Sequence, residues 1–337
     1  MEKAVSAVSR DGACPPSLPE NWYILATSNE LAPGGIISRE IGGHEMVLYR
    51  SEKSGVVHAF TGHCAHMGCH LKHGTVIGDD LRCCLHFRHI QPDGRFLNSD
   101  GSPSQDLVQP GYAVKERYNA IFVYMGGEPR YGLPESDLIA PDKLIAQPAG
   151  ELFIPARWFA LMANGFDMEH LHAVHHRELM EEPVISEPYA HAFRIAYHTR
   201  AVGKTLADRV LKKLSGNSIR ASMTCIGGTT VLVQSQATMW RSLFLMSLCP
   251  ARENGTLVRA IVGVEKKGRL FNGIGLRMAH WLFKAFLIKD LTIFDGIEWH
   301  PPEHLHTSGD NFTTRFYEFI TSLKPAFPQD QEKRQRP

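Results

Sequence analysis

Short apolar runs, bounded by glycine, proline or charged residues, fill the first part of the chain. They have the length of β-strands and lie at residues 22–28, 45–49, 56–60, 81–84 and 121–125. Glycine pairs at 34–35 and 42–43 and the Asp93-Gly94 pair are typical of the turns between such strands. The pattern predicts a first domain built only of β-strands, which we place at residues 20–130.

A different pattern begins near Phe153. Residues 157–179 contain no proline and predict a helix, while residues 194–202 and 257–264 predict strands. Only Gly227-Gly228 separates the apolar runs 221–226 and 229–235, which is typical of a β-hairpin. We therefore expect a second domain at residues 150–325, with helices on an antiparallel sheet in a helix-grip-like arrangement. The fold class is then α+β, and the proline-containing segment 133–148 is expected to connect the domains.

One late segment has the periodicity of an amphipathic helix. Within residues 276–293, apolar residues recur at spacings of three, four and seven: Leu276, Ala279, Phe283, Phe286 and Ile293. Asp290 falls on the same face. Because a carboxylate among apolar side chains costs free energy unless a partner satisfies it, we treat Asp290 as a candidate ligand.

The composition narrows the classes of function. A chain of 337 residues with 43% hydrophobic residues and a formal charge of +1 has the balance of a globular protein and not of a general nucleic-acid binder. Its most apolar stretches, 242–249 and 281–288, are short of the roughly 20 residues of a membrane span, and residues 1–19 lack the apolar run of a signal peptide. Four of the seven cysteines lie within residues 64–84, which favours metal binding in a reducing, cytoplasmic location over a disulfide framework.

Two Cys–His pairs form the first candidate site. Cys64-Ala65-His66 is followed, after sixteen residues, by Cys83-x-x-His86. Two thiolates and two imidazoles on separate loops suit a [2Fe–2S] cluster with the imidazoles on one iron. They also suit tetrahedral zinc, which is the alternative. Among the neighbours, we expect Cys69 and Cys84 to be small packing residues, and the other histidines of the region to lie at the surface or behind the ligands: His63, His70, His73 and His89.

A second histidine group contains the spacing Asp167-x-x-His170-x₄-His175. Two histidines with one carboxylate form the ligand set of oxygen-activating ferrous enzymes, which keeps coordination positions open. The carboxylate can come from a distant segment, and we choose Asp290. From the residues alone, a helix with solvated polar side chains is an equal interpretation. His172 and His176 are rival ligands, and Asp295 and Glu298 are rival carboxylates.

Both groups together resemble a known family. Cys64-Ala65-His66-Met67-Gly68, Gly74-Thr75-Val76, Cys83-x-x-His86 and the Asp93-Gly94 turn resemble the Rieske domain of ring-hydroxylating oxygenases. The run from Asn164 to His175 resembles the mononuclear-iron motif of the same enzymes, in which an aliphatic–aromatic pair such as Ile293-Phe294 follows the late carboxylate. The chain departs from the family where proline usually follows the second cysteine and Gly-Trp the second histidine, since Cys84, Phe87 and Arg88 stand there.

The resemblance implies a terminal oxygenase with a [2Fe–2S] cluster on Cys64, His66, Cys83 and His86 and a mononuclear Fe(II) on His170, His175 and Asp290. It implies that Asp167 bridges a cluster histidine of one subunit and an iron-bound histidine of its neighbour, in a head-to-tail homotrimer. No Gly-x-Gly-x-x-Gly segment follows a strand, so a ferredoxin or flavin-dependent reductase is expected to supply electrons. A Rieske-type electron carrier without oxygenase chemistry is the alternative.

The substrate is expected to be a small hydrophobic molecule with rings. Within the family, the motifs are most similar to those of ketosteroid hydroxylases and of arylamine N-oxygenases of the aminopyrrolnitrin type, both of which are monooxygenases. We expect the substrate pocket to be lined from the hairpin 221–235 and from the late helix.

Overall fold

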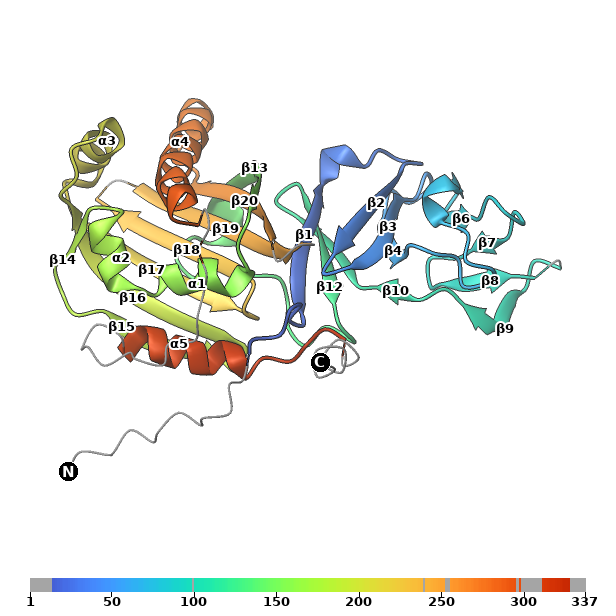
Figure 1. Cartoon of the computed structure of the whole chain (residues 1–337). Helices are drawn as coiled ribbons and strands as arrows, with labels where there is room; N and C mark the ends of the chain where they lie inside the picture. Colours follow the sequence, from blue (N-terminus) through green and yellow to red (C-terminus); the bar gives the residue numbers. More distant parts are fainter. Residues whose placement is uncertain are drawn as a thin grey trace.

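Antiparallel sheets form the framework of the molecule (Figure 1). The computed structural model describes residues 14–98, 100–238, 240–251, 255–294, 297 and 311–327. Three small sheets precede residue 126, and one large sheet follows residue 143. No helix in the described ranges is long and apolar enough to cross a membrane.

The three small sheets form the N-terminal part of the fold. In spatial order, the first holds β1 (Asn21–Thr27), β12 (Ala120–Met125) and β11 (Val114–Arg117), and the second holds β10 (Gly111–Tyr112), β4 (Val57–Thr61), β3 (His44–Arg50) and β2 (Ile36–Ile41). The third sheet runs in chain order through β5 (Thr75–Ile77), β6 (Asp80–Arg82), β7 (His89–Ile90), β8 (Arg95–Leu97) and β9 (Pro103–Val108). Short 3₁₀ turns lie at Ser28–Glu30 (η1) and Leu71–His73 (η2).

The large sheet has eight strands. Its spatial order is β13 (Leu144–Ile154), β20 (Thr256–Glu265), β19 (Trp240–Pro250), β18 (Thr230–Ala237), β17 (Ile219–Ile226), β16 (Ala192–Ala201) and β14 (Arg177–Leu179), and β15 (Val184–Tyr189) also pairs with β16. The predicted hairpin is β17–β18. Its turn places Gly227 and Gly228 at φ 55° and 82°, a conformation that glycine adopts without a steric penalty.

Helices cover one face of this sheet. They are α1 (Trp158–Gly165), α2 (Met168–Ala173), α3 (Leu206–Ser215), α4 (Arg269–Phe294) and α5 (Asn311–Thr321), and a 3₁₀ turn, η3 (Pro141–Lys143), precedes β13. Side chains of α1, α2, α5 and the end of α4 share one buried core with residues of β16–β20. The arrangement is a curved antiparallel sheet that holds helices against its face (Figure 1).

The opposite face of the large sheet packs against the N-terminal part. Along β19, Leu243 and Leu245 join a core with Trp22 and Phe122 of the first small sheet. The alternate residue Leu248 belongs to the core under the helices. This alternation is the period-two pattern of a strand that is buried on both faces.

The α+β expectation, an all-β N-terminal part followed by a helix-grip-like sheet, is confirmed. Two local expectations were wrong. Residues 133–148 are not only a connection, because β13 begins at Leu144 and forms the edge of the large sheet. The single helix expected at residues 157–179 is instead two short helices and a strand, broken at Phe166–Asp167 and ending at Ala173.

The amphipathic face of the late helix is unevenly buried. Leu276, Ala279 and Phe283 are 6%, 2% and 9% exposed, whereas Phe286 and Ile293 are 38% and 36% exposed. This face borders two cavities: Ala279, Phe283 and Phe286 line one of them, and Phe286 also lines the other together with Asp290.

Candidate metal centres

The break between α1 and α2 positions the first histidine. α1 ends at Gly165, and Asp167 then acts as the N-cap of α2. Its Oδ1 accepts hydrogen bonds from the backbone N–H groups of Glu169 at 2.9 Å and His170 at 3.0 Å. Aspartate is among the best N-cap residues, because its side chain satisfies N–H groups that the first helical turn leaves unpaired. The cap therefore fixes the start of α2 and with it the backbone of His170.

The end of α2 positions the second histidine. Residues five apart on a continuous helix point about 140° away from each other, so His170 and His175 would not meet on one helix. α2 ends at Ala173, and the chain then turns toward β14. His176, with φ 53°, lies in this turn. Ending the helix brings His175 back toward His170.

Three side chains from two distant segments meet at this point. The Nε2 atoms of His170 and His175 are 3.1 Å apart, and Oδ1 of Asp290, from α4, is 3.0 Å from each of them. Their side chains are only 9%, 3% and 13% exposed. The structure thus brings together the three residues that the sequence singled out as ligands of one metal.

The three distances have the geometry of a facial set of ligands. With metal–ligand bonds of about 2.1 Å, two ligands at right angles lie about 3.0 Å apart and two opposite ligands about 4.2 Å. All three pairs here are 3.0–3.1 Å apart. The donor set and its spacing therefore fit a mononuclear metal ion that keeps the opposite face open to other ligands.

Electrostatics favour a carboxylate at Asp290 and a neutral imidazole at His175, which are the forms that bind a metal ion. Burial raises the pKa of Asp290, but hydrogen bonds with His170 and His175 outweigh it, so its pKa lies below the ordinary value. Burial lowers the pKa of His175 in spite of the neighbouring carboxylate. A carboxylate beside a neutral imidazole is a pair of electron-pair donors. The Nδ1 atom of His175 and the Nδ2 atom of Asn164 are buried without hydrogen-bond partners in the described part of the chain, and such atoms concentrate at functional sites.

The rival ligands are not near this group or cannot be placed. His172 and His176 are exposed, and the Nδ1 atom of His172 lies 3.2 Å from the carbonyl oxygen of Arg177. Asp295 and Glu298 lie outside the described residues. Among the side chains that the structure describes, Asp290 is the carboxylate that lies between the two histidines.

The two Cys–His pairs also meet, at the far end of the molecule. Their loops lie between β4 and η2 and between β6 and β7. Cys64 and Cys83 are 4% and 3% exposed and their thiols interact, while the rings of His66 and His86 lie edge to face with centroids 4.9 Å apart. The thiols pair in the interior and the imidazoles pair toward the solvent. This separation fits a cluster with one thiolate-bound and one imidazole-bound iron.

Two neighbours in these loops differ from expectation. Cys84 is exposed, so it is not a buried packing residue, and its Sγ atom lies 3.2 Å from that of the partly buried Cys69. Phe87, which occupies a position where the resembling family has glycine, has φ 55°. A bulky residue pays a steric penalty in this left-handed region, which glycine avoids.

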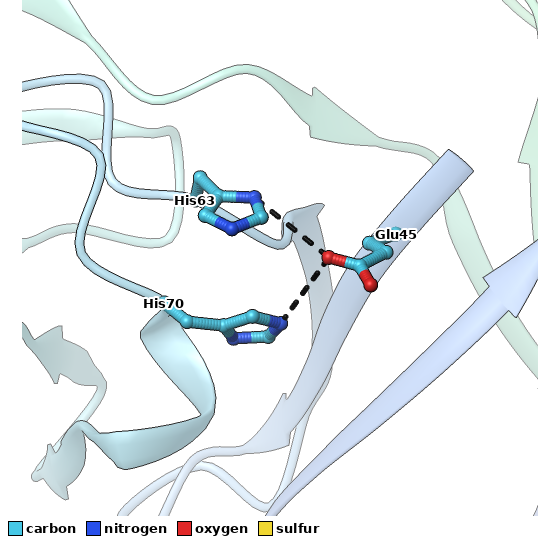
Figure 2. Close-up of side chains that lie close together, drawn as sticks. All are labelled: Glu45, His63 and His70. Atoms are coloured by element: carbon cyan, nitrogen blue, oxygen red, sulfur yellow. Dashed lines mark ion pairs between the residues drawn. The ribbon is translucent and has the colours of Figure 1, made fainter. Parts of the chain in front are cut away.

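A third group lies beside the cluster loops and was not predicted. Figure 2 shows His63 and His70 facing Glu45, with Nδ1 and Nε2 atoms 3.9 and 3.7 Å from Oε2 of the carboxylate. The Nδ1 atom of His70 accepts a hydrogen bond from the backbone N–H of Lys72 at 3.1 Å. In its neutral form the ring then carries its proton on Nε2, which leaves no lone pair there for a metal. The group is therefore a polar contact that ties the loop after β4 to strand β3.

Two adjoining cavities lead to the three-residue group. A cavity of about 120 Å³ is lined by His170, His175 and Asp290, and one of about 200 Å³ lies beside it. Residues that border both are Leu171, Tyr197, Val233, Met246 and Phe286. Phe286 also stacks on the ring of His175 at 3.5 Å between centroids. The hairpin and the late helix contribute to the lining as expected, whereas Tyr197 was missed because nothing in the sequence of β16 sets it apart.

The lining of the larger cavity is mostly apolar but includes charged side chains. Arg177 and Asp208 form an ion pair at 3.2 Å in this lining, which also contains Lys289. Burial lowers the pKa of Arg177, although the paired carboxylate opposes this. No motif or periodicity predicted this pair, which joins the start of β14 to the first turn of α3.

Comparisons with known proteins agree with these sites. Residues 21–109 match the model of the Rieske [2Fe-2S] domain. The oxygenase component of chloroacetanilide N-alkylformylase from Rhizorhabdus wittichii is 28% identical over 177 residues, which are 50% of this chain and 49% of that protein. Cholesterol 7-desaturase nvd 1 from Ciona intestinalis is 27% identical over 258 residues, 70% of this chain and 54% of that protein. The chain thus spans about half the length of these curated relatives.

Solved structures share the fold across most of the chain. NdmA from Pseudomonas putida with caffeine has a TM-score of 0.69 at 16% identity and covers 89% of each chain. Dicamba monooxygenase bound to dicamba has a TM-score of 0.62 at 15% identity, over 96% of this chain and all of the other. At such identities the likeness establishes the fold alone.

The chain is therefore a relative of Rieske oxygenase α subunits and carries a Rieske [2Fe–2S] domain, as predicted. The expectation of a cluster together with a mononuclear metal site is confirmed by the domain match and by the grouping of His170, His175 and Asp290. The same domain match favours a [2Fe–2S] cluster over zinc at the Cys–His site.

Proposed function

We propose that this chain is the terminal oxygenase component of a Rieske non-haem iron system. It would use O₂ and electrons from a separate protein to oxidise, most simply to monooxygenate, a small hydrophobic molecule with rings. The single observation that carries the proposal is the facial group of His170, His175 and Asp290, which opens into an apolar cavity.

The ligand assignment follows from this geometry. We assign the mononuclear iron to His170, His175 and Asp290 and the cluster to Cys64, His66, Cys83 and His86. An Fe(II) held by two histidines and one carboxylate supplies open positions at which oxygen is activated. The protein's part is to hold these donors rigid: the Asp167 cap fixes His170, and the stack on Phe286 fixes the ring of His175. A Rieske electron carrier would need no such group and no cavity beside it.

The positions of the two sites favour electron transfer between subunits. In Figure 1 the cluster loops beside β6 and β7 lie at one end of the molecule, whereas α2 and α4 lie at the other. Large apolar side chains that adjoin the cluster histidines in the sequence are exposed: Met67, Leu85 and Phe87 are 65%, 49% and 65% exposed. Exposed apolar groups of this kind are typical of interfaces. They support a head-to-tail homotrimer in which the cluster of one subunit meets the iron site of the next, with Asp167 between them.

The electron donor is proposed to be a ferredoxin or a flavin-dependent reductase. Basic side chains lie around the cluster loops: Lys72, Arg82, Arg88 and Arg95. An acidic donor would be attracted to them, and its rate of association would fall with ionic strength. The cytoplasmic location stays a prediction from the cysteine pattern.

The cavities support the proposed substrate class. Together they reach the lower end of the roughly 300–1,000 Å³ typical of small-molecule sites, and their walls are mostly apolar. The ion pair of Arg177 and Asp208, in the lining of the larger cavity, offers a polar point to a substituent of the substrate. A steroid or a substituted arylamine meets this description.

The test is product formation by the iron-loaded chain with a surrogate ferredoxin and reductase. A panel of steroids and arylamines is incubated under ¹⁸O₂, and products are identified by mass spectrometry. We expect oxygen-dependent oxidation of at least one compound by the wild type and none by His175→Ala, whose cluster spectrum should be intact. Full product formation by His175→Ala would refute the ligand assignment, and a wild type that exchanges electrons but holds no mononuclear iron would be an electron carrier.

A further inference from the structure

Two cysteines that are not assigned to the cluster face each other across its loops. Cys69 lies in the first cluster loop, five residues after Cys64 and three after His66. Cys84 lies in the second loop and directly follows Cys83. Their Sγ atoms are 3.2 Å apart. A disulfide bond is about 2.05 Å long, so a small movement of two side chains would join them. Cys84 is exposed and Cys69 partly buried, which leaves the pair open to a reagent from solvent.

The backbone holds both residues in place without a covalent link. The N–H of Cys64 donates to the carbonyl oxygen of Cys69 at 2.8 Å, which closes the first loop at its base. In the second loop, the N–H of Cys83 donates to the carbonyl oxygen of Arg88 at 3.0 Å. Each loop is thus closed on itself, and the sulfur pair is a contact from one loop to the other. Preorganised sulfurs of this kind favour an intramolecular disulfide over reaction with two separate molecules.

We propose that Cys69 and Cys84 form a reversible disulfide that clamps the two cluster-holding loops in response to a low-molecular-weight disulfide. One cysteine sulfur attacks the small disulfide, forms a mixed disulfide and releases one small thiol. The second cysteine sulfur then attacks the protein-bound sulfur of that mixed disulfide and releases the other thiol. Two protein thiols are oxidised, one small disulfide is reduced to two thiols, and the two protons pass to those thiols.

The clamp acts on the cluster and goes beyond the proposed oxygenase activity. All four cluster ligands lie in the two loops that the bond would join. The two loops must move apart before the cluster can leave the protein. A covalent link between them restricts this movement and should slow the loss of the cluster. Intracellular disulfides are typically transient and regulatory, so a bond that forms under oxidative conditions and is reversed by thiols fits the predicted location.

The test uses the cluster-loaded full chain in a Cys14→Ser background, because Cys14 is exposed and would react independently. The protein is treated with oxidised glutathione or with dithiothreitol, alkylated with N-ethylmaleimide in the folded state, and mapped by mass spectrometry. We expect alkylation of Cys69 and Cys84 after dithiothreitol, and a Cys69–Cys84 link without alkylation at either residue after glutathione. The linked form should lose its visible absorption to a chelator at least about twofold more slowly. Dithiothreitol should restore the first state.

The single variants Cys69→Ser and Cys84→Ser separate the clamp from other roles. Each should keep the cluster spectrum and take up one glutathione on the remaining cysteine, since the second exchange step is lost. The proposal is overturned if both thiols of the parent chain stay open to alkylation after glutathione, or if each carries its own glutathione. It is also overturned if either folded variant lacks the cluster, because that cysteine would then be a ligand. None of these readouts needs substrate, oxygen or the mononuclear iron, so failure of the oxygenase proposal leaves this test unaffected.

Discussion

Replacing Asp167 separates two roles that we assign to this carboxylate. In the structure its Oδ1 caps α2 through the N–H groups of Glu169 and His170. In the proposed trimer the same side chain lies between a cluster histidine and an iron-bound histidine. Both capping bonds end on Oδ1, so the cap does not need the second oxygen. Asp167→Asn keeps an N-cap of nearly equal quality and loses the negative charge, whereas Asp167→Ala loses both.

The magnitudes follow from the two hydrogen bonds. Loss of an N-cap side chain typically costs about 1 kcal/mol, and a change of this size lowers the melting temperature of a domain of this size by about 2–4 °C. We expect this for Asp167→Ala. Asp167→Asn should lie within about 0.5 kcal/mol of the wild type, because only a charge near the helix N-terminus is lost. Both variants should bind cluster and iron, and both should be slow in electron transfer.

The assay pairs thermal unfolding, followed by circular dichroism, with single-turnover oxidation of the prereduced cluster, followed by its visible absorption. We expect a normal melting temperature and stalled cluster oxidation for Asp167→Asn. Undiminished electron transfer in this variant would remove the bridging role. An unchanged melting temperature in Asp167→Ala would show that the cap contributes nothing to stability.

Three further predictions concern the cluster loop, the cavity and the iron. Phe87→Gly should raise the free energy of unfolding by about 0.5–1 kcal/mol, because it removes a bulky residue from a backbone position with φ 55°. Met67→Gly, at an equally exposed position, should lower it, and equal effects of the two variants in thermal melts would refute backbone strain at Phe87. Val233→Phe should lower kcat/KM at least tenfold, or about 1.4 kcal/mol, because it narrows the junction of the two cavities. Val184→Phe, at an exposed position of β15, should leave kcat/KM unchanged, and equal steady-state kinetics of the two variants would show that substrate does not pass through this junction. A ferrous chelator should lower the melting temperature of the wild type without bleaching the cluster, because a metal at 100 times its Kd contributes about 2.7 kcal/mol to the free energy of unfolding. The melting temperature of His170→Ala should not change, and a decrease in both proteins would place the metal elsewhere.

Local chemistry made parts of the fold and site predictable. The β17–β18 hairpin depends on two adjacent glycines, and the cluster loops depend on Cys–His spacings that lie within one short segment. Asp290 stood out because a carboxylate on an apolar helix face needs a partner. In each case the residues that carry the pattern lie within one short segment or on one face of a single helix.

The rest depends on contacts that the sequence does not display. β13 contains Pro148, and the prolines of segment 133–148 suggested a connection. An edge strand tolerates proline, however, and the register of β13 shifts between Pro148 and Gly150. The helix expected at 157–179 breaks because the side chain of Asp167 competes for backbone N–H groups. The contact between Cys69 and Cys84 and the ion pair of Arg177 and Asp208 arise only when separate loops and elements pack together.

We propose that one chain holds a Rieske cluster and a separate oxygen-activating iron on His170, His175 and Asp290. The iron and acid-labile sulfide contents of the wild type and of His175→Ala, measured beside their cluster spectra, test this assignment. We expect about three irons and about two sulfides per chain for the wild type, and about two of each for the variant, with identical cluster spectra. Two irons in both proteins would refute the second iron site and leave an electron carrier.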